Sequence, residues 1–311
     1  MKISFCTTCM GRLHHLKETL PQNIRDNLPR AGSDDPQVEF VVLDYNSKDG
    51  LEEWIKNDPE MVHHMTTGTL VYAKTREPEF FHHAHAKNMA HRLGSGDVLC
   101  NVDADNFTGP RFANFLADIF EDDRGVIVHP AFQRVKEKPL EERGFYGRIA
   151  MTRDSFFNLG GYNENRFKGW GTEDTHFMLR GYALGLKPVS IFDQEFFKVI
   201  CHTHQERFAN AASKDVSLAN IRRCSSGNLW DRIEAKLNRA YVAFSMAQSN
   251  RDGDFGTGTV EVGLNGDMVK MQPVAQTAIK LRFAFNGIST YKETRLHTPQ
   301  GDEPNSAHAP A

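Results

Sequence analysis

Two adjacent carboxylates, Glu173 and Asp174, follow a tryptophan between two glycines in the stretch GWGT at 169–172. A carboxylate can accept the proton of an attacking hydroxyl group, and an aromatic ring can stack on the apolar face of a sugar. The same residues also suit an ordinary loop, because glycines mark turns, Trp170 could anchor a core and acids favour helix starts. The stretch therefore indicates carbohydrate chemistry, but the rest of the chain has to decide it.

A second pair of carboxylates, Asp103 and Asp105, follows directly on the apolar run 97–102. One residue separates them, so in an extended chain both side chains leave the same side. Two such carboxylates resist joint ionisation unless a cation compensates their charge. A hard divalent ion such as Mg²⁺ or Mn²⁺ suits the pair and would bridge to the phosphate oxygens of a substrate. Capping or turn roles, which are common for Asp, are the alternative.

A third group of polar side chains lies at 201–206, where His202 and His204 are candidate metal ligands. Neutral imidazole suits borderline ions such as Mn²⁺. The chain has 14 histidines, so a structural role is the competing interpretation. A zinc site that joins Cys6, Cys9, Cys201 and His204 is a further alternative, although the spacing does not require it.

These groups need a scaffold, and the first half of the chain alternates short apolar runs with helical patterns, which indicates an α/β sheet. We expect strands at 2–8, 38–43, 69–73, 97–102, 125–129 and 187–192, and helices at 12–20, from 51, at 84–93, 110–120 and 175–184. Open α/β sheets bind ligands outside the carboxyl ends of their strands. Asp44, Asp103 and Asp105 are therefore expected on one rim.

Four parts of the chain are expected. Residues 1–207 form the sheet domain, 208–252 a helical extension packed on it, 253–297 a small β-rich appendage and 298–311 a disordered tail. The helical extension rests on an apolar stripe over 229–244, and the appendage on short strands at 257–262, 268–272, 278–285 and 289–294 around glycine-rich turns. The predicted class is an α/β fold, with a mostly parallel sheet flanked by helices and a helical and β-rich C-terminal addition.

Composition disfavours several classes of protein. The 311 residues carry a net charge of −3 and a pI near 6.5, which provides no global basic field for nucleic acid. Five cysteines are an odd and sparse set, so reduced thiols are expected rather than a disulfide framework. The first residues are too quickly polar for a signal peptide, and no run approaches the roughly 18 apolar residues of a membrane span. A soluble, cytoplasmic protein is expected.

The motifs taken in order resemble one family. DAD at 103–105, GGYNE at 160–164, GWGTED at 169–174 and HQE at 204–206 resemble the GT-A nucleotide-sugar glycosyltransferases of the family 2-like group. The likeness is greatest to the β-1,4-galactosyltransferase and bacterial chondroitin-polymerase type. The stretches 6–12 and 44–49 resemble nucleotide-binding edges of that fold, and Ala-Lys-Asn at 86–88 stands where related enzymes often carry Ala-Arg-Asn. The resemblance covers roughly residues 1–207.

The resemblance implies a metal-dependent, inverting transfer of a sugar from a nucleotide-diphosphate sugar, with UDP the expected nucleotide, to a hydroxyl acceptor. It implies roles position by position. The nucleotide pocket would be lined by Thr7, Thr8, Arg12, Asp44 and Lys87. Asp103 would face the ribose or the metal, while Asp105 and His204 would ligate Mn²⁺ or Mg²⁺. Trp170 would stack on the sugar, Glu173 would hold substrate hydroxyls and Asp174 would be the catalytic base.

One position departs from the family pattern, because His176 stands where another acid is common two residues after the base. This departure leaves the acceptor contacts open, and a glycan, a lipid, a protein or a modified nucleic acid all remain candidate acceptors. Phe145 and Tyr146 could help to stack the sugar or could pack beneath the loop. Two other functions stay open: a nucleotidyltransferase that uses the same acids, and a non-catalytic glycan-binding protein that uses the β-rich segment from Gly253.

Overall fold

The computed structural model describes residues 1–165, 171–215, 217–219, 250 and 253–274. Within these ranges one sheet runs in the order β7-β5-β6-β4-β1-β2-β3-β8-β9. Four parallel strands form its centre: β1 (Lys2–Cys9), β2 (Gln37–Tyr45), β3 (Leu70–Thr75) and β4 (Val98–Asn101). On one side β6 (Ala150–Thr152) is antiparallel to both β4 and β5 (Val126–Pro130), and β7 (Lys187–Ile191) is parallel to β5.

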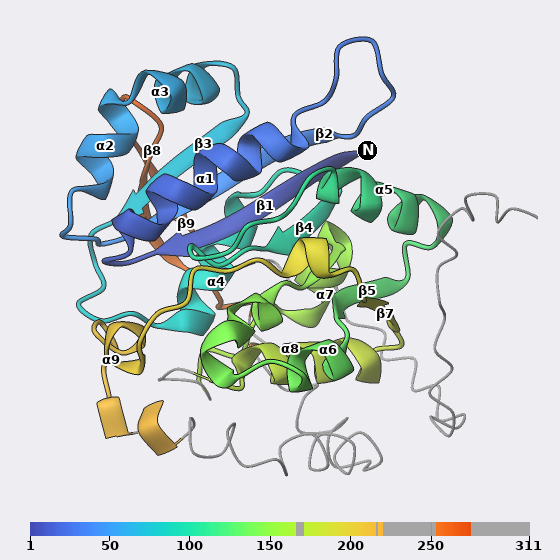
Figure 1. Ribbon diagram of the computed structural model, residues 1–311. Coiled ribbons are helices and arrows are strands. Elements are labelled where there is room, and N and C mark those ends of the chain that lie inside the picture. Colours follow the sequence, from blue (N-terminus) through green and yellow to red (C-terminus); the bar gives the residue numbers. More distant parts are fainter. Residues whose placement is uncertain (166–170, 216, 220–249, 251–252, 275–311) are drawn as a thin grey trace, which may run out of the picture.

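Helices cover both faces of the sheet. One core cluster packs α1 (Leu13–Asn27), α2 (Leu51–Asn57), α3 (Pro59–Thr66) and α5 (Phe112–Asp122) on one face, and Figure 1 shows α1 lying along β1 and β2. A second cluster packs α4 (His83–Leu93), α7 (Arg153–Leu159) and α8 (Glu173–Ala183) on the other face. Short elements complete the description: α6 (Phe132–Lys136), η1 (Leu140–Gly147), η2 (Gln194–Phe197) and α9 (His204–Arg207).

The predicted α/β class with a mostly parallel sheet is confirmed. The strands expected in the first half of the chain lie within two residues of β1 to β5, and α1 differs most from its expected bounds. The expected helix ends at Leu20, yet α1 continues through Pro21 to Asn27. Pro21 costs the helix a hydrogen bond, but Asn23, Ile24 and Asn27 beyond it are all buried, and that packing keeps the helix intact.

The β-rich segment after Gly253 differs from the expected appendage. Its first two strands, β8 (Gly258–Val262) and β9 (Asp267–Met271), form a hairpin that pairs antiparallel with β3 and so extends the central sheet (Figure 1). Arg92 of α4 donates to the carbonyls of Phe255 and Gly256, which fixes the approach to the hairpin. The expected helix at 229–244, the strands at 278–285 and 289–294 and the tail from 298 lie outside the described residues.

A buried polar seam on α1 holds the loop after β4. Thr19 donates to the carbonyl of Ala104 at 2.7 Å, and Asn23 donates to the carbonyl of Asn106 at 2.9 Å. Asn27, one turn further, donates to the Thr108 hydroxyl at 2.8 Å. The three helical residues are spaced by four, so they share one face and pin the Asp103–Asp105 loop from below.

None of the helices in the described ranges has both the length and the apolar character that crossing a membrane requires.

Candidate active site

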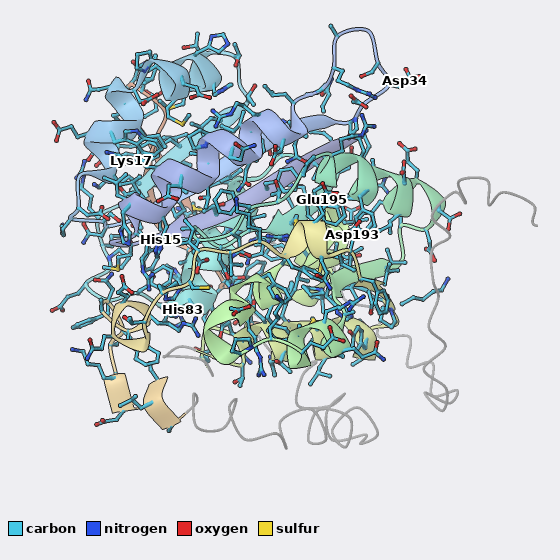
Figure 2. The ribbon with its side chains drawn as sticks, in the orientation of Figure 1. His15, Lys17, Asp34, His83, Asp193 and Glu195 are labelled. Atoms are coloured by element: carbon cyan, nitrogen blue, oxygen red, sulfur yellow. The ribbon has the colours of Figure 1, made fainter. Side chains whose placement is uncertain are left out.

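A cavity of about 190 Å³ lies at the carboxyl ends of β1 and β4. Its walls come from the start of α1, the start of α4, the loop after β4, η1, the start of α8 and the segment 202–211. Figure 2 labels two of the lining residues, His15 on α1 and His83 on α4. The cavity brings together seven of the residues that sequence predicted for a site: Thr8, Arg12, Lys87, Asp103, Asp105, Glu173 and Asp174.

Asp105 and a histidine form the side of the cavity where the predicted metal ligands lie. Its Oδ2 lies 2.8 Å from His202 Nε2, and its Oδ1 accepts a 2.8 Å hydrogen bond from the Asn106 amide. Burial alone would raise the Asp105 pKa, but the His202 contact, the Asn106 bond and the Arg12 charge outweigh it and lower the pKa. Asp105 is therefore an ionised donor at neutral pH.

His202, which sequence left as the alternative to His204, is the histidine that contacts Asp105. Its ring also stacks at 5.5 Å on His15. The backbone of His204 begins α9, whereas its side chain lies outside the described part of the chain. Metal binding by His204 therefore stays a prediction, and His202 joins it as a candidate ligand.

Asp103 faces the middle of the cavity. Its Oδ1 accepts a 3.0 Å hydrogen bond from the Asn101 amide, and it lies 3.9 Å from the Lys87 ammonium. Burial raises its pKa, and the negative charge of Asp105 adds to the effect, while Lys87 opposes it. The two acids of the DAD motif thus differ in protonation tendency although one residue separates them.

Glu173 and Asp174 occupy the first turn of α8, where the helix dipole favours negative charge. Both are buried. Thr172, just before them, has a φ of 73°, which turns the chain sharply into the helix. Burial raises the Asp174 pKa from 3.8 to about 7, and the nearby Lys87 charge offsets only part of that cost. A carboxylate with such a pKa is suited to proton transfer near neutral pH.

Lys87 is the cation of this acidic side. Its Nζ lies 2.7 Å from Asp174 Oδ1 and 3.4 Å from Glu173 Oε1. The side chain is buried, and three surrounding acids raise its pKa even though burial by itself would lower it. The nucleotide contact of Lys87 stays a prediction. Within the described residues its ammonium contacts the carboxylates of Glu173 and Asp174.

Gly147 of η1 separates the two carboxylate pairs. A methyl carbon at this position would lie 2.9 Å from Asp103 Oδ2 and 3.0 Å from Asp174 Oδ2. Bare backbone is therefore required between them, since any larger side chain would push on both carboxylates. This contact shows that the DAD loop and the start of α8 face the same space.

Two predicted nucleotide contacts are not brought to the cavity. Thr7 is buried on the opposite face of β1 from Thr8, as strand alternation requires. Asp44 is fully buried and its oxygens accept from the Ser47 amide at 2.7 Å and the Tyr72 hydroxyl at 2.9 Å. Lys74 completes its surroundings at 3.2 Å. Asp44 therefore closes the end of β2 by internal bonds instead of lining the cavity.

The aromatic candidates divide. Phe145 is buried and stacks on Phe197 with ring centroids 4.5 Å apart, which is the packing role. Tyr146 lines the cavity, and its hydroxyl lies 2.9 Å from Thr175 Oγ1. Trp170 lies outside the described residues. His176, the departure from the family pattern, is buried on α8 and is not among the residues that line the cavity.

Several lining residues were missed by sequence reasoning. His83 lies one helical turn before Lys87 on α4, so the spacing of four could have marked it as a partner on the same face. Asn210 closes the cavity from the far end of the segment, because its amide donates to the Met10 carbonyl and its own carbonyl accepts from Phe81, both at 2.7 Å. No local sequence pattern predicts the contact between Asn210 and Phe81.

The donor set fits a nucleotide-associated divalent ion better than a closed zinc site. Among the described residues, no three His, Cys, Asp or Glu side chains are grouped to hold an ion alone. Nucleotide-site Mg²⁺ is commonly held by one or two carboxylates, with substrate phosphates and water completing the shell. The carboxylates of Asp105 and the nearby Asp103 match that arrangement, and the imidazole of His202 suits Mn²⁺. The zinc alternative is not supported, since Cys6 and Cys9 pack in different core clusters on opposite faces of β1.

One family model matches part of the chain. Residues 129–205 match the N-terminal domain of galactosyltransferase. This span contains η1, Glu173, Asp174 and His202, but it does not reach the DAD loop at Asp103. No curated protein sequence matches the chain.

Several solved structures are similar in outline. The mannosyltransferase PcManGT from Pyrobaculum calidifontis, in complex with GDP-Man and Mn²⁺, has a TM-score of 0.48 and 20% identity, covering 79% of this chain and 72% of that chain. TarS from S. aureus, in complex with UDP, has a TM-score of 0.48 and 12% identity, covering 74% and 73%. The Drosophila β-1,4-galactosyltransferase 7, with manganese, UDP-Gal and xylobiose, has a TM-score of 0.44 and 15% identity, covering 68% and 75%.

Proposed function

We propose that this chain is a metal-dependent, inverting glycosyltransferase of the GT-A type that moves a sugar from a nucleotide-diphosphate sugar, with UDP as the nucleotide, to a hydroxyl acceptor. One observation carries the proposal: a single cavity joins two carboxylate pairs, Asp103 with Asp105 and Glu173 with Asp174. The match of residues 129–205 to a galactosyltransferase domain supports it, because that span contains the second pair.

Asp174 is the proposed general base. It lines the cavity, stands in the first turn of α8, and has a pKa raised by burial to about 7. A base with this pKa is half ionised near neutral pH and is stronger than an ordinary carboxylate. Such a base contributes about 10²–10⁴-fold to the rate by accepting the acceptor's hydroxyl proton. A single displacement from the opposite face of the sugar then inverts the anomeric centre.

Lys87 and Glu173 hold the Asp174 carboxylate and the loop before it in place. The Lys87 ammonium bonds Asp174 at 2.7 Å and leaves the other oxygen of Asp174 for the acceptor hydroxyl. Glu173 accepts from the Gly171 amide at 3.1 Å, which holds the loop before α8. Its second oxygen lies 3.4 Å from Lys87 Nζ, where a substrate hydroxyl would compete for it. These contacts support an orienting role for Glu173 rather than a second proton transfer.

Asp105 and His202, with Asp103 nearby, would hold the divalent ion together with phosphate oxygens of the donor. Mn²⁺ or Mg²⁺, when bound there, supplies Lewis-acid stabilisation of the negative charge that develops on a leaving diphosphate. Asp105 offers an ionised oxygen because its pKa is lowered. Arg12, whose charge is felt at Asp105, lines the same wall and would bind the phosphates by its guanidinium. Thr8 would complete the nucleotide side.

The test is a donor screen with product identification. Purified protein is incubated with UDP-linked and GDP-linked sugars, with and without Mn²⁺, and release of the nucleoside diphosphate is measured. Asp174→Asn is compared with Asp154→Asn, since Asp154 is an exposed acid in the first turn of α7. We expect nucleoside diphosphate release that needs Mn²⁺ and Asp174 but not Asp154. Release of pyrophosphate would indicate a nucleotidyltransferase, and glycan binding without turnover would indicate a binding protein.

A further inference from the structure

Arg148 is a buried cation directly behind the DAD loop. It is 1% exposed and lies between η1 and β6. Its Nη2 donates to Asn106 Oδ1 at 3.2 Å and to the Phe107 carbonyl at 2.7 Å. Its Nε and Nη1 have no hydrogen-bond partner among the described residues. The guanidinium thus makes few bonds for the charge it carries.

Burying such a charge has a measurable consequence. Loss of solvent lowers the pKa of Arg148 to about 10, and the carboxylates of Asp103 and Asp105 offset only part of the effect. A buried charge is weak evidence for a contribution to stability, because apolar side chains that replace a whole buried ion pair often leave stability unchanged or raise it. The guanidinium carbon lies 5.4 Å from the centroid of the Phe112 ring. Stability alone therefore does not account for an arginine here.

The Asn106 side chain connects Arg148 to Asp105, on the side of the cavity where the predicted metal ligands lie. A side-chain amide accepts through its oxygen and donates through its nitrogen. Because Arg148 donates to Oδ1, the Nδ2 group must point the other way, and there it donates to Asp105 Oδ1 at 2.8 Å and to the Gly144 carbonyl at 3.3 Å. The second oxygen of Asp105 then faces His202 at 2.8 Å. Three consecutive contacts thus run from the buried cation to the imidazole.

We propose that Arg148 is a positioning residue that orients the Asp105 carboxylate through the Asn106 amide and so sets the affinity of the cavity for divalent metal. The inference rests on the proposed function, since it requires that Asp105 binds metal. Arg148 touches neither metal nor substrate in this scheme. Its effect is to select one orientation of the amide, and through it one orientation of the carboxylate.

The experiment measures metal binding without turnover. Mn²⁺ is titrated into the full chain at a fixed concentration of UDP, with UDP alone as the blank, and free Mn²⁺ is followed by electron paramagnetic resonance, for wild type, Arg148→Met, Asn106→Ala and the double variant. Loss of a group that orients a metal ligand typically weakens metal affinity about 10–100-fold. We expect this loss in each single variant. The double variant should bind no more weakly than the weaker single variant, because residues that act through one contact are not additive.

Arg180→Met is the matched control. Arg180 is also buried, also has a pKa lowered by burial, and donates to the carbonyls of Leu159 and Gly161 at the end of α7. It should lose thermal stability while keeping wild-type Mn²⁺ affinity. If Arg148→Met does not fold, Asn106→Ala carries the test by itself.

Three outcomes overturn the proposal. The first is unchanged Mn²⁺ affinity in either folded variant, and the second is an equal loss in Arg180→Met, which would indicate a general effect of core damage. In the third, wild type itself does not bind Mn²⁺, so that the metal dependence of the proposed function fails and the positioning role fails with it. Binding by wild type with unchanged variants removes only the role of Arg148.

Discussion

The two sides of the cavity use the same chemical group in opposite ways. Asp105 and Asp174 are both buried carboxylates. Both are desolvated, which raises a carboxyl pKa, but Asp105 receives contacts from His202 and Asn106 that lower its pKa overall. Asp174 is likewise desolvated, its contact with Lys87 offsets only part of that effect, and its pKa rises to about 7.

This difference teaches that hydrogen-bond partners, rather than burial, divide the work between the acids. A carboxylate that is ionised throughout the neutral range suits a cation, whereas one that titrates near neutrality suits proton transfer. Gly147 keeps the two types in one space without a side chain between them.

The largest effect is expected at Asp174. Asp174→Asn removes the base but keeps the shape, so kcat/KM for sugar transfer should fall about 10²–10⁴-fold. Mn²⁺ affinity should not change, because Asp174 lies on the opposite side of the cavity from Asp105 and His202. Steady-state kinetics and Mn²⁺ titration on the same preparation check both statements. Near wild-type turnover in a folded Asp174→Asn protein would contradict the assignment of the base.

The next effect concerns stability at Lys87. Lys87→Met leaves Glu173 and Asp174 buried without their cation, which typically costs about 3–5 kcal/mol. The pKa of Asp174 is raised on folding from 3.8 to about 7, so the stability that its protonation supplies is complete below 3.8 and is lost as pH rises through 7. Without the lysine that loss becomes larger.

The Lys87→Met protein should therefore be destabilised more at pH 8 than at pH 5, as measured by urea unfolding at both values. Lys56→Met is the control, since the ion pair between Lys56 and Glu52 is partly exposed to solvent. Equal destabilisation at the two pH values would show that Lys87 contributes packing alone.

A smaller effect is expected at Asp105. Asp105→Asn should weaken Mn²⁺ binding about 10–100-fold or more, by analogy with the loss of groups around metal sites. Part of the activity should return at high Mn²⁺, and chelation should abolish it in wild type. Asp97→Asn, at the opposite end of β4, is the control that should leave the Mn²⁺ dependence unchanged. Activity that is indifferent to chelation would exclude a metal role for this side.

The smallest effect on the reaction is expected at Asp44. Asp44→Asn should lower stability by about 1–3 kcal/mol because Tyr72 and Lys74 lose an ionised partner. The KM for the nucleotide sugar should stay close to that of wild type, since Asp44 does not line the cavity. Arg12→Met, which changes the cavity wall, should raise that KM. A raised KM in Asp44→Asn with unchanged stability would restore its predicted nucleotide contact.

Much of the scaffold could be predicted because the apolar runs of β1, β2 and β5 and the helical spacing of α5 are local signals. The region from 131 to 159 could not, since its elements are short. The three-residue β6 exists because β4 and β5 lie on either side of it. The same holds for β8 and β9, whose place in the central sheet depends on pairing with β3, far away in the sequence.

The candidate site also has residues that the sequence identifies and contacts that it does not. Asp103, Asp105, Glu173 and Asp174 are adjacent in short motifs, and their types alone indicate chemistry. The partner of each pair is far away: Lys87 is 87 residues from Asp174, and His202 is 97 residues from Asp105. These distant contacts decide the pKa values, so sequence could list the acids but could not assign their protonation.

The pH profile of nucleoside diphosphate release, at saturating Mn²⁺, tests the difference between the two sides most directly. For wild type, log kcat/KM should rise with a slope of one up to a midpoint near pH 7 and then level, because the raised pKa of Asp174 keeps the base protonated at lower pH. Asp105→Asn should keep that midpoint at a lower rate, and Asp174→Asn should lose the rise. A rise near pH 7 that persists in Asp174→Asn would contradict the account.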